Sequence, residues 1–555
     1  MKKTVKLSVI IALCSVIIGG CSKKSVTNSH LVAVPKDAAI VLSLNSKQIV
    51  DKAGLNNPEQ YEFYKVLQKE IEYESAQNAT IIKDFLKNTR TSGLNLDNIF
   101  AYMGIGAEST YPYYGIVFLI DNLKTFEGLL QKMELFSEID IESKFIVLPD
   151  GESIMQWNDE IAVMSNAMAH GIDIFNKDES KSILANELFK ADYSDKNDIY
   201  IYCENNFFFK LFDIFTYHMD YTTDYAALES MAAYKDLSMS VSINSEKGEF
   251  VAKLKMMPEE KAMEAFGNLY KTDFDSNLYA YFPDQSLMAF KFAVKPLDIY
   301  NNYKKTIGMQ TGENSSETST EQVEIIDEDG NVTDSEEVVI EKYSGYTSNY
   351  NYALKLMIEQ YDEKITSVLE NFTGDCIGSL SGLANLMNPD FAIAAGIVEG
   401  KENDVIALIE QMGFAKNSDG YYSQQVKNLN LYCAVNKNIA YFTGAPEAIA
   451  KFLDKGYSSN ITSSKNFGKE LKAAMAYFYL NININDYPAL LKTYIAMTQE
   501  GRMVMPLLEK LESININTTG IHNSEFKIKL SDNNYASKVL LKEIDKLLSE
   551  YFVSN

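Results

Sequence analysis

The feature that most constrains the fold of this chain is an internal repeat with a nearly constant spacing. Segments with the same apolar pattern occur in both halves of the 555 residues. Matched positions are 276 to 279 residues apart, a constancy that chance alternation of apolar residues does not produce. The pattern therefore predicts two tandem copies of one unit. The matched pairs are Asp97 and Asp375, Phe126 and Val405, Ile161 and Ile439, Tyr200 and Tyr477, and Phe250 and Phe526.

The second copy is predicted to carry an acidic insertion. Pro35 and Pro283 precede the opening strands of the two copies, and they are only 248 residues apart. The extra length of the second copy lies at about 310–345, a stretch rich in carboxylates. Within it, two β-branched runs at 323–326 and 338–340 flank an Asp-Gly pair. This arrangement predicts a hairpin, with a solvated loop as the alternative interpretation.

The order of elements within each copy predicts the fold class. A strand follows the proline, helices come next, and a run of strands broken by single helices ends in an antiparallel pair. Such runs, joined by hairpin turns, are typical of α+β domains with a mainly antiparallel sheet. We therefore expect two tandem copies of this sheet, each with helices packed on one face. The first unit is predicted at residues 32–272 and the second at residues 273–555.

The first residues predict export and lipid attachment. A basic start is followed by an apolar run from Leu7 to Ile18, which is shorter than the roughly 17 to 25 residues of a membrane-spanning helix. The run ends in what looks like a bacterial lipobox. We expect a signal peptide at residues 1–20 and a flexible lipidated tether at residues 21–31; an ordinary signal peptide is the alternative. The lipobox residues are Ile18, Gly19 and Gly20, and the lipidated residue is Cys21.

Length and charge narrow the class of protein further. A chain of this length exceeds one ordinary hydrophobic core, and 46% of its residues are hydrophobic, which is enough to fill several cores. The net charge is −25, and no basic cluster follows the predicted signal peptide. Nucleic acid is therefore excluded as a partner. Direct adsorption to anionic lipid is also disfavoured, so the predicted anchor must hold the protein at the membrane.

Two segments near the start carry a family resemblance. They are Val34-Pro35-Lys36-Asp37-Ala38-Ala39-Ile40-Val41-Leu42-Ser43-Leu44-Asn45 and Lys52-Ala53-Gly54-Leu55. They resemble a family of lipoproteins from gut Bacteroidales that is catalogued as domain of unknown function 4836. The resemblance implies a Gram-negative outer-membrane lipoprotein and carries no catalytic residue across. In those bacteria acidic residues after the lipidated cysteine favour surface display; here Ser22-Lys23-Lys24 follows, so we expect the periplasmic face.

The cysteines and histidines do not show the spacing of a catalytic or metal-binding site. An odd number of widely spaced cysteines follows the lipobox, so we expect buried free thiols, with one disulfide as the alternative. Their counterparts in the other copy are leucine, asparagine and methionine, which fits small buried side chains rather than nucleophiles. The four histidines are scattered without metal-ligand spacing. The sequence therefore predicts no catalytic, cofactor-binding or metal site. The three cysteines are Cys203, Cys376 and Cys433.

Tyrosines are the remaining candidates for contact with a ligand or partner. Exposed aromatic side chains stack on sugar rings and anchor protein interfaces. One group surrounds Pro112, and a second flanks a glycine turn. Packing at strand ends is the alternative role for both groups. The candidates are Tyr111, Tyr113, Tyr114, Tyr421 and Tyr422.

These observations favour a lipid-anchored envelope protein without catalytic activity. Duplication without a repeated polar constellation indicates a large binding surface, offered to another envelope protein or to a ligand held between the copies. The second hypothesis is a periplasmic or surface module that binds glycan or peptide through the tyrosines. The third is a hydrolase with an unrecognised site.

The lipobox gives the first testable prediction. Replacing Cys21 with Ala removes the thiol that accepts diacylglycerol, so we expect incorporation of labelled palmitate to be lost. Membrane fractionation should show the same change, because the tether has no other anchor. A variant changed at Cys14, within the apolar run, should incorporate label as the parent does. Undiminished labelling of the Cys21→Ala protein contradicts the prediction.

Overall fold

The computed structural model describes most of the chain after its first residues. The lipobox, Cys21 and most of the tether lie outside the described residues. No helix in the described part of the chain is long and apolar enough to cross a membrane. The described residues are 28–74, 89–105, 112–132, 138–140, 142–148, 153–166, 178–208, 210–211, 235–267, 269–306, 318–326, 332–341, 349–383, 389–427 and 429–554.

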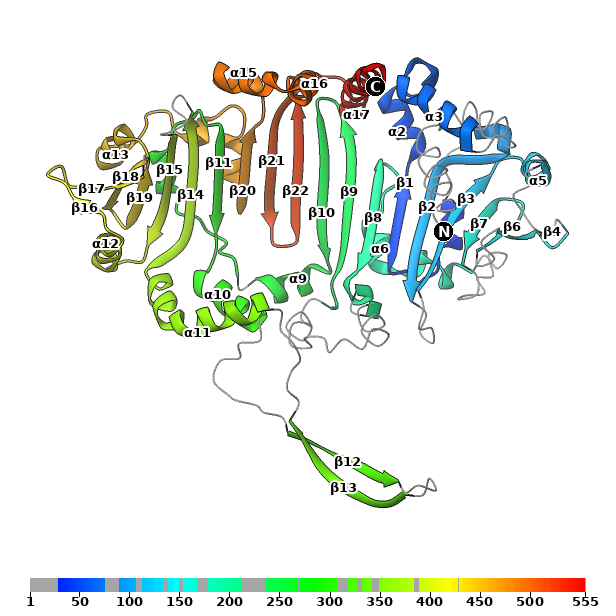
Figure 1. Ribbon diagram of the computed structural model, residues 1–555, viewed down its shortest axis with the longest axis horizontal. Coiled ribbons are helices and arrows are strands. Elements are labelled where there is room, and N and C mark those ends of the chain that lie inside the picture. Colours follow the sequence, from blue (N-terminus) through cyan, green and yellow to red (C-terminus); the bar gives the residue numbers. More distant parts are fainter. Residues whose placement is uncertain are drawn as a thin grey trace.

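One long antiparallel sheet organises the molecule (Figure 1). Its strands come from two halves of the chain that meet near the middle. From one edge, the first half contributes β4 (Glu138–Asp140), β5 (Phe145–Val147), β6 (Ile154–Trp157), β7 (Ile161–Ser165), β3 (Pro112–Ile120), β2 (Leu94–Ile105), β1 (Ile40–Leu44), β8 (Ile199–Glu204), β9 (Ser238–Glu246) and β10 (Glu249–Met257). The second half continues with β22 (Asn523–Leu530), β21 (Leu511–Gly520), β20 (Ala476–Asn481), β11 (Met288–Ala293), β14 (Phe372–Gly382), β15 (Asp390–Ile397), β19 (Ile439–Thr443), β18 (Leu429–Asn436), β17 (Tyr422–Val426) and β16 (Ala415–Lys416).

The two halves join where β10 pairs with β22, which we call the seam. Ala252 lies opposite Phe526, and the ladder runs from Glu249 to Lys255. Each pairing between described strands is antiparallel, so the predicted class, α+β with a mainly antiparallel sheet, is confirmed. The outward order is the same on both sides of the seam. It reads β10, β9, β8, β1, β2, β3 in one direction and β22, β21, β20, β11, β14, β15 in the other.

Short helices cover one face of the sheet, which we call the covered face. Successive side chains of a strand alternate between faces, and the covered face holds the two largest clusters of buried side chains. In the first half, η1 (Asn28–Ala33), η5 (Ile183–Ala185) and α6 (Glu187–Asp192) pack on this face. In the second half, η7 (Ser276–Tyr281), η8 (Ile461–Ser463), α13 (Pro446–Leu453) and α14 (Gly468–Ala473) do so.

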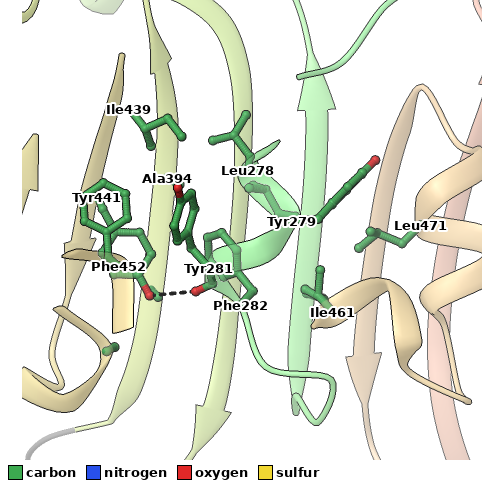
Figure 2. Close-up of a cluster of buried hydrophobic side chains, with 14 of the residues drawn as sticks. Leu278, Tyr279, Tyr281, Phe282, Ala394, Ile439, Tyr441, Phe452, Ile461 and Leu471 are labelled. Atoms are coloured by element: carbon green, nitrogen blue, oxygen red, sulfur yellow. Dashed lines mark hydrogen bonds between the residues drawn. The ribbon is translucent and has the colours of Figure 1, made fainter. Parts of the chain in front are cut away.

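Aromatic packing dominates the covered core of the second half (Figure 2). Tyr441 of β19 stacks on Phe452 of α13, with 4.7 Å between ring centroids. Its hydroxyl donates a hydrogen bond of 3.1 Å to the backbone oxygen of Tyr281. The ring is thus buried without leaving its polar atom unsatisfied, which is the condition for placing tyrosine in a core.

The longer helices lie at the ends of the strands rather than flat on a face, a difference from the predicted packing (Figure 1). Most of these helices directly follow or precede a strand, which places them at the strand ends. At one end of the sheet lie α2 (Ser46–Ala53), α3 (Glu62–Glu74), α15 (Ala489–Met497), α16 (Gln499–Leu508) and α17 (Ala536–Ser554). At the other end lie α9 (Glu259–Phe266), α10 (Pro296–Thr306) and α11 (Asn349–Leu369). Helices α5 (Leu123–Lys132) and α12 (Glu402–Gln411) lie near the outer strands, and the short turns of 3₁₀ helix are η2 (Pro58–Gln60), η3 (Thr89–Ser92), η4 (Glu179–Lys181) and η9 (Ile484–Asp486).

The acidic insertion contains the expected hairpin. Strand β12 (Thr318–Ile326) pairs with β13 (Val332–Glu341), and the hairpin projects away from the main sheet (Figure 1). The two β-branched runs do not face each other, because Val338 lies opposite Glu321. The Asp-Gly pair between the strands falls outside the described residues.

The last helix of the chain stabilises the first half. Asp545 of α17 accepts a hydrogen bond of 2.9 Å from the backbone N–H of Phe63, at the start of α3. Ser537 bonds Ser245 of β9 at 2.9 Å. Val539 is 6% exposed and packs in one cluster with side chains of β10 and β22. The chain therefore closes on itself, with its end held against its beginning.

This closure generates a stability prediction. Val539→Asp places a carboxylate in an apolar cluster, and the uncompensated charge should lower the free energy of unfolding by several kcal/mol. Hydrogen exchange should rise in α2, α3 and β9, although these segments lie about 300 or more residues away in sequence. Lys542→Asp, an exposed change on the same helix, serves as control and should leave the exchange pattern intact. Increased exchange confined to α17 would contradict the prediction.

Candidate functional site

The face opposite the short helices carries a continuous apolar row, and we call this side the open face. Directly paired residues of antiparallel strands project from the same side of a sheet. The row crosses the seam, and because neighbouring strands lie about 4.8 Å apart, it is about 50 Å long. Its members are Leu44, Ile199, Ile243, Ala252, Phe526, Ile516, Phe478, Phe290, Gly378, Ile393 and Phe442.

Flanking rows on the open face are also almost entirely apolar. The three rows together contain no charged side chain, and their polar members are Ser524, Thr518 and Ser245, which lies opposite Phe250. One flanking row consists of Leu42, Ile201, Val241, Leu254, Ser524, Thr518, Ala476, Phe292, Cys376 and Ala395. The other consists of Ser245, Phe250, Ile528, Ile514, Leu480, Met288, Leu380 and Phe391.

Solvent reaches the centre of these rows. Phe526 is 38% exposed and Ile516 is 40% exposed, whereas Asn515, on the covered face, is 1% exposed. Phe292 and Ile393 are each 37% exposed. Monomeric proteins seldom leave a contiguous apolar patch of more than a few hundred Å² in water unless it binds something. The open face is therefore the strongest candidate for a binding surface among the described residues.

Two elements border the open face at opposite strand ends. Helix α17 packs against Phe250 and Ile528 at one end. Phe207 and Leu211, which follow β8, pack near Ile40 and Met103 at the other end. The exposed centre of the open face lies between these two borders.

The covered face becomes polar where it crosses the seam. Between the two sets of short helices lies a groove of about 340 Å³. Lys255 pairs with Asp192 at 3.0 Å, and Lys253 lies 3.7 Å from Glu525 across the seam. Thr519 borders this groove and also a second pocket of about 450 Å³. These charged residues of the seam are thus on the side away from the open face.

A buried lysine borders the second pocket. Lys291 of β11 is 3% exposed, and its Nζ donates 3.0 Å hydrogen bonds to the Tyr279 hydroxyl and the Leu471 backbone oxygen. The Phe274 ring lies 4.9 Å from the Nζ. Burial lowers the pKa of Lys291 to about 8, although the nearby charge of Asp375 acts in the opposite direction.

Lys291 was not among the predicted site residues, because the alternation of side chains along a strand does not show which face of the sheet the helices cover. In the run from Met288 to Ala293, Phe290 and Phe292 alternate with Lys291. Apolar side chains inside and lysine outside would be the usual reading of such a strand. The structure has the opposite arrangement, with both phenylalanines on the open face. Ser43, which lies 248 residues earlier in the sequence, is also buried.

The predicted tyrosines do not form one site. Tyr113 is 2% exposed, with its hydroxyl 2.8 Å from Asp37, and Tyr422 is 3% exposed in a core cluster. Both side chains therefore pack in a core, which was the alternative role for these tyrosines. Tyr114 is 43% exposed and Tyr421 is half-buried against Tyr432; β3 and β17 lie in opposite halves of the sheet (Figure 1). Tyr111 lies outside the described residues.

The three cysteines are free thiols; Cys203 and Cys433 are buried as expected, whereas Cys376 is half-buried. Burial raises the pKa of Cys203 to about 11, and that of Cys376 and Cys433 to about 12 each. His30 packs edge-on against Phe100, and His522 borders the second pocket. Within the described ranges no three His, Cys, Asp or Glu side chains gather as metal ligands.

The raised thiol pKa values predict slow chemistry. At pH 8 the thiolate fraction of each cysteine should be about 0.1% or less, because the pH lies about three or more units below each pKa. A disulfide-exchange reagent should therefore titrate the three thiols within minutes only after denaturation. Fast reaction of one thiol in the folded protein would contradict the prediction and mark that cysteine as reactive. Cys203→Ser, Cys376→Ser and Cys433→Ser identify which one reacts.

Comparison with known proteins adds a family but no activity. No curated protein matches the chain. Three crystal forms of TP0453 match with a TM-score of 0.23. Forms III and I are 9% and 8% identical and share 45% of this chain and 91% of theirs; form IV is 12% identical and shares 44% and 86%. The family described as Domain of unknown function (DUF4836) matches residues 31–537, and the chain therefore belongs to this family.

Proposed function

We propose that this protein is a lipid-anchored, non-catalytic binding component of the outer membrane, and that its open face binds the acyl chains of lipid. The observation that carries this proposal is the uncharged apolar surface that spans both halves of the sheet. Burying such a surface gains about 25 cal/mol for each Å² removed from water. Phe526, which is 38% exposed, can therefore contribute to affinity without any hydrogen bond when a ligand covers it.

Internal duplication supports a binding role. We propose that the chain contains two copies of one unit, since the repeat spacing and the matched strand order outward from the seam agree. Two copies joined edge to edge double the width of one apolar face without creating a cleft between domains. In this arrangement the whole sheet, rather than either copy, forms the binding surface.

Acyl chains fit the open face better than the other occupants. A glycan requires many hydrogen-bonding partners, and the rows offer only Ser524, Thr518 and Ser245, whose hydroxyl already bonds Ser537. A second copy would bring two chains of net charge −25 together, and the borders formed by α17 and Phe207 stand between two facing sheets. A flexible hydrocarbon chain needs neither polar partners nor a flat counterpart.

The location follows from the predicted lipobox and from Ser22-Lys23-Lys24 after Cys21. We propose the periplasmic face of the outer membrane, where the anchor keeps the open face close to lipid. The raised thiol pKa values argue against a cysteine nucleophile. A hydrolase with a site outside the described residues is the competing proposal, and turnover that a point mutation abolishes would favour it.

Lipid binding is tested directly on purified protein. Native mass spectrometry of the wild type should detect bound lipid, and a fluorescent fatty acid should be displaced by added phospholipid. Phe526→Lys combined with Ile516→Lys places two charges at the centre of the open face. We expect fatty-acid affinity to fall about 10-fold or more, because each ammonium must lose water for the chain to bind.

Met412→Lys makes the same chemical change at an apolar residue that is 61% exposed on the end of α12. This control should bind like the wild type. Equal affinity of the double variant and the control would refute acyl-chain binding at the open face. Concentration-dependent dimerisation that the double variant abolishes would instead assign the face to self-association.

A further inference from the structure

The pocket beside Lys291 lies on the covered face and has no part in the proposed lipid surface. Residues of η7, β11 and α14 form its walls, together with the turn between β21 and β22. Its volume is about 450 Å³, which is within the usual range for small-molecule sites. Apolar side chains alternate with amines and hydroxyls around it. The apolar members include Met263, Phe274, Ala293, Ala474, Met475 and Ile521.

We propose that this pocket binds a small organic anion, a carboxylate or a phosphate monoester, through Lys291 and Tyr279. The hydrocarbon part of the ligand would lie against Phe274 and Met475. Nothing in the repeat would have indicated this site, because it is present in one half only. The corresponding positions of the first half, at the 248-residue spacing, are Ser43 and Leu31.

Two hydrogen-bond donors converge at the proposed anion position. An ammonium group has three donors, and the two hydrogen bonds of Lys291 to Tyr279 and Leu471 leave one N–H available. Since Lys291 donates to the Tyr279 oxygen, the Tyr279 hydroxyl hydrogen is available to another acceptor. Figure 2 shows the Tyr279 side chain directed away from the Tyr281 and Phe452 rings. Tyr279 belongs to the edge of the aromatic core, and both Tyr279 and Lys291 line the pocket.

Local charge favours an anion although the chain as a whole is acidic. Lys271, Lys291 and Lys472 border the pocket, against one bordering carboxylate, Asp273. Lys271 is already paired with the 3% exposed Asp375, at 2.5 Å. Asp375 therefore serves Lys271. Among the described residues, no carboxylate lies at hydrogen-bond distance from the buried Lys291 amine. An anion would provide the missing partner, and charge-assisted hydrogen bonds are stronger than neutral ones.

Protonation of Lys291 should couple to binding. Its pKa of about 8 in the empty pocket reflects burial, and an adjacent anion would raise it. The protonated form binds, so affinity should be greatest below pH 8 and should fall as the pH rises above it. The charged or titratable groups around Lys291 are Asp375 on β14, Tyr477 on β20, Glu470 and Lys472 on α14, and Lys271, Asp273, Tyr279 and His522.

Calorimetric titration of the full-length protein with hexanoate and hexyl phosphate tests the proposal. Hexan-1-ol, which has the same hydrocarbon chain and no charge, is the matched ligand control and should bind at least about 10-fold more weakly. Wild-type affinity for the anions should fall about 10-fold or more between pH 7 and pH 9.5. Tighter binding of hexanoate identifies a carboxylate ligand, and tighter binding of hexyl phosphate identifies a phosphate ester.

Variants separate the pocket from the open face. Lys291→Met should weaken anion binding about 10-fold or more and remove its pH dependence, and Tyr279→Phe should weaken it several-fold. Lys469→Met, an exposed change on α14, and Phe526→Lys on the open face should leave it unchanged. Equal binding of hexan-1-ol, wild-type affinity in both pocket variants, or no heat at about 20 mM ligand would overturn the proposal. If Lys291→Met does not fold, Tyr279→Phe and the pH dependence decide.

Discussion

Backbone pairing between β10 and β22 is the interaction on which the rest of this structure depends. Each strand would otherwise be a free edge, with a row of unpaired N–H and C=O groups that invites aggregation. Pairing the two strands removes both free edges and makes one sheet from two halves. Helix α17 reinforces the junction, because it follows β22 and packs on β9 and β10 and beside α2 and α3. The stability of each half therefore depends on the other.

A sheet of this kind has two unlike surfaces. The covered face buries aromatic cores beneath short helices in each half, but at the seam no described short helix crosses it, and its side chains there are polar: Ser242, Lys253, Glu525 and Asn517. The open face has the reverse character, with apolar side chains from Leu44 to Phe442. Helix α12 packs on its outer end at Phe442, and no described helix covers its centre. The two binding proposals follow from this difference between the faces. We propose that hydrocarbon binds the open face and that a small anion binds the covered face beside Lys291.

Individual residues show how far sequence reasoning reached. Strand periodicity and the closing hairpins predicted an antiparallel α+β fold, and the β-branched runs predicted the hairpin of the insertion. Buried free cysteines were also expected, since their counterparts are other small side chains. The burial of Tyr113 and Tyr422 could not be predicted in this way, because an aromatic residue at a strand end can lie either in a core or on the surface. Lys291 was missed for the same physical reason.

The sequence by itself determined the order of elements, the alternation along each strand and the positions that recur in the second half. These are local properties, set by side-chain shape and backbone preference within a few residues. Only the tertiary structure decided which side of the sheet the short helices cover and which edges meet. Period-two alternation defines two faces but does not distinguish them. The docking of α13 over Tyr441 and of α14 over Lys291 distinguishes the two faces, and the pairing of Ala252 with Phe526 joins the two halves. These contacts join separate elements, so no local pattern in the sequence specifies them.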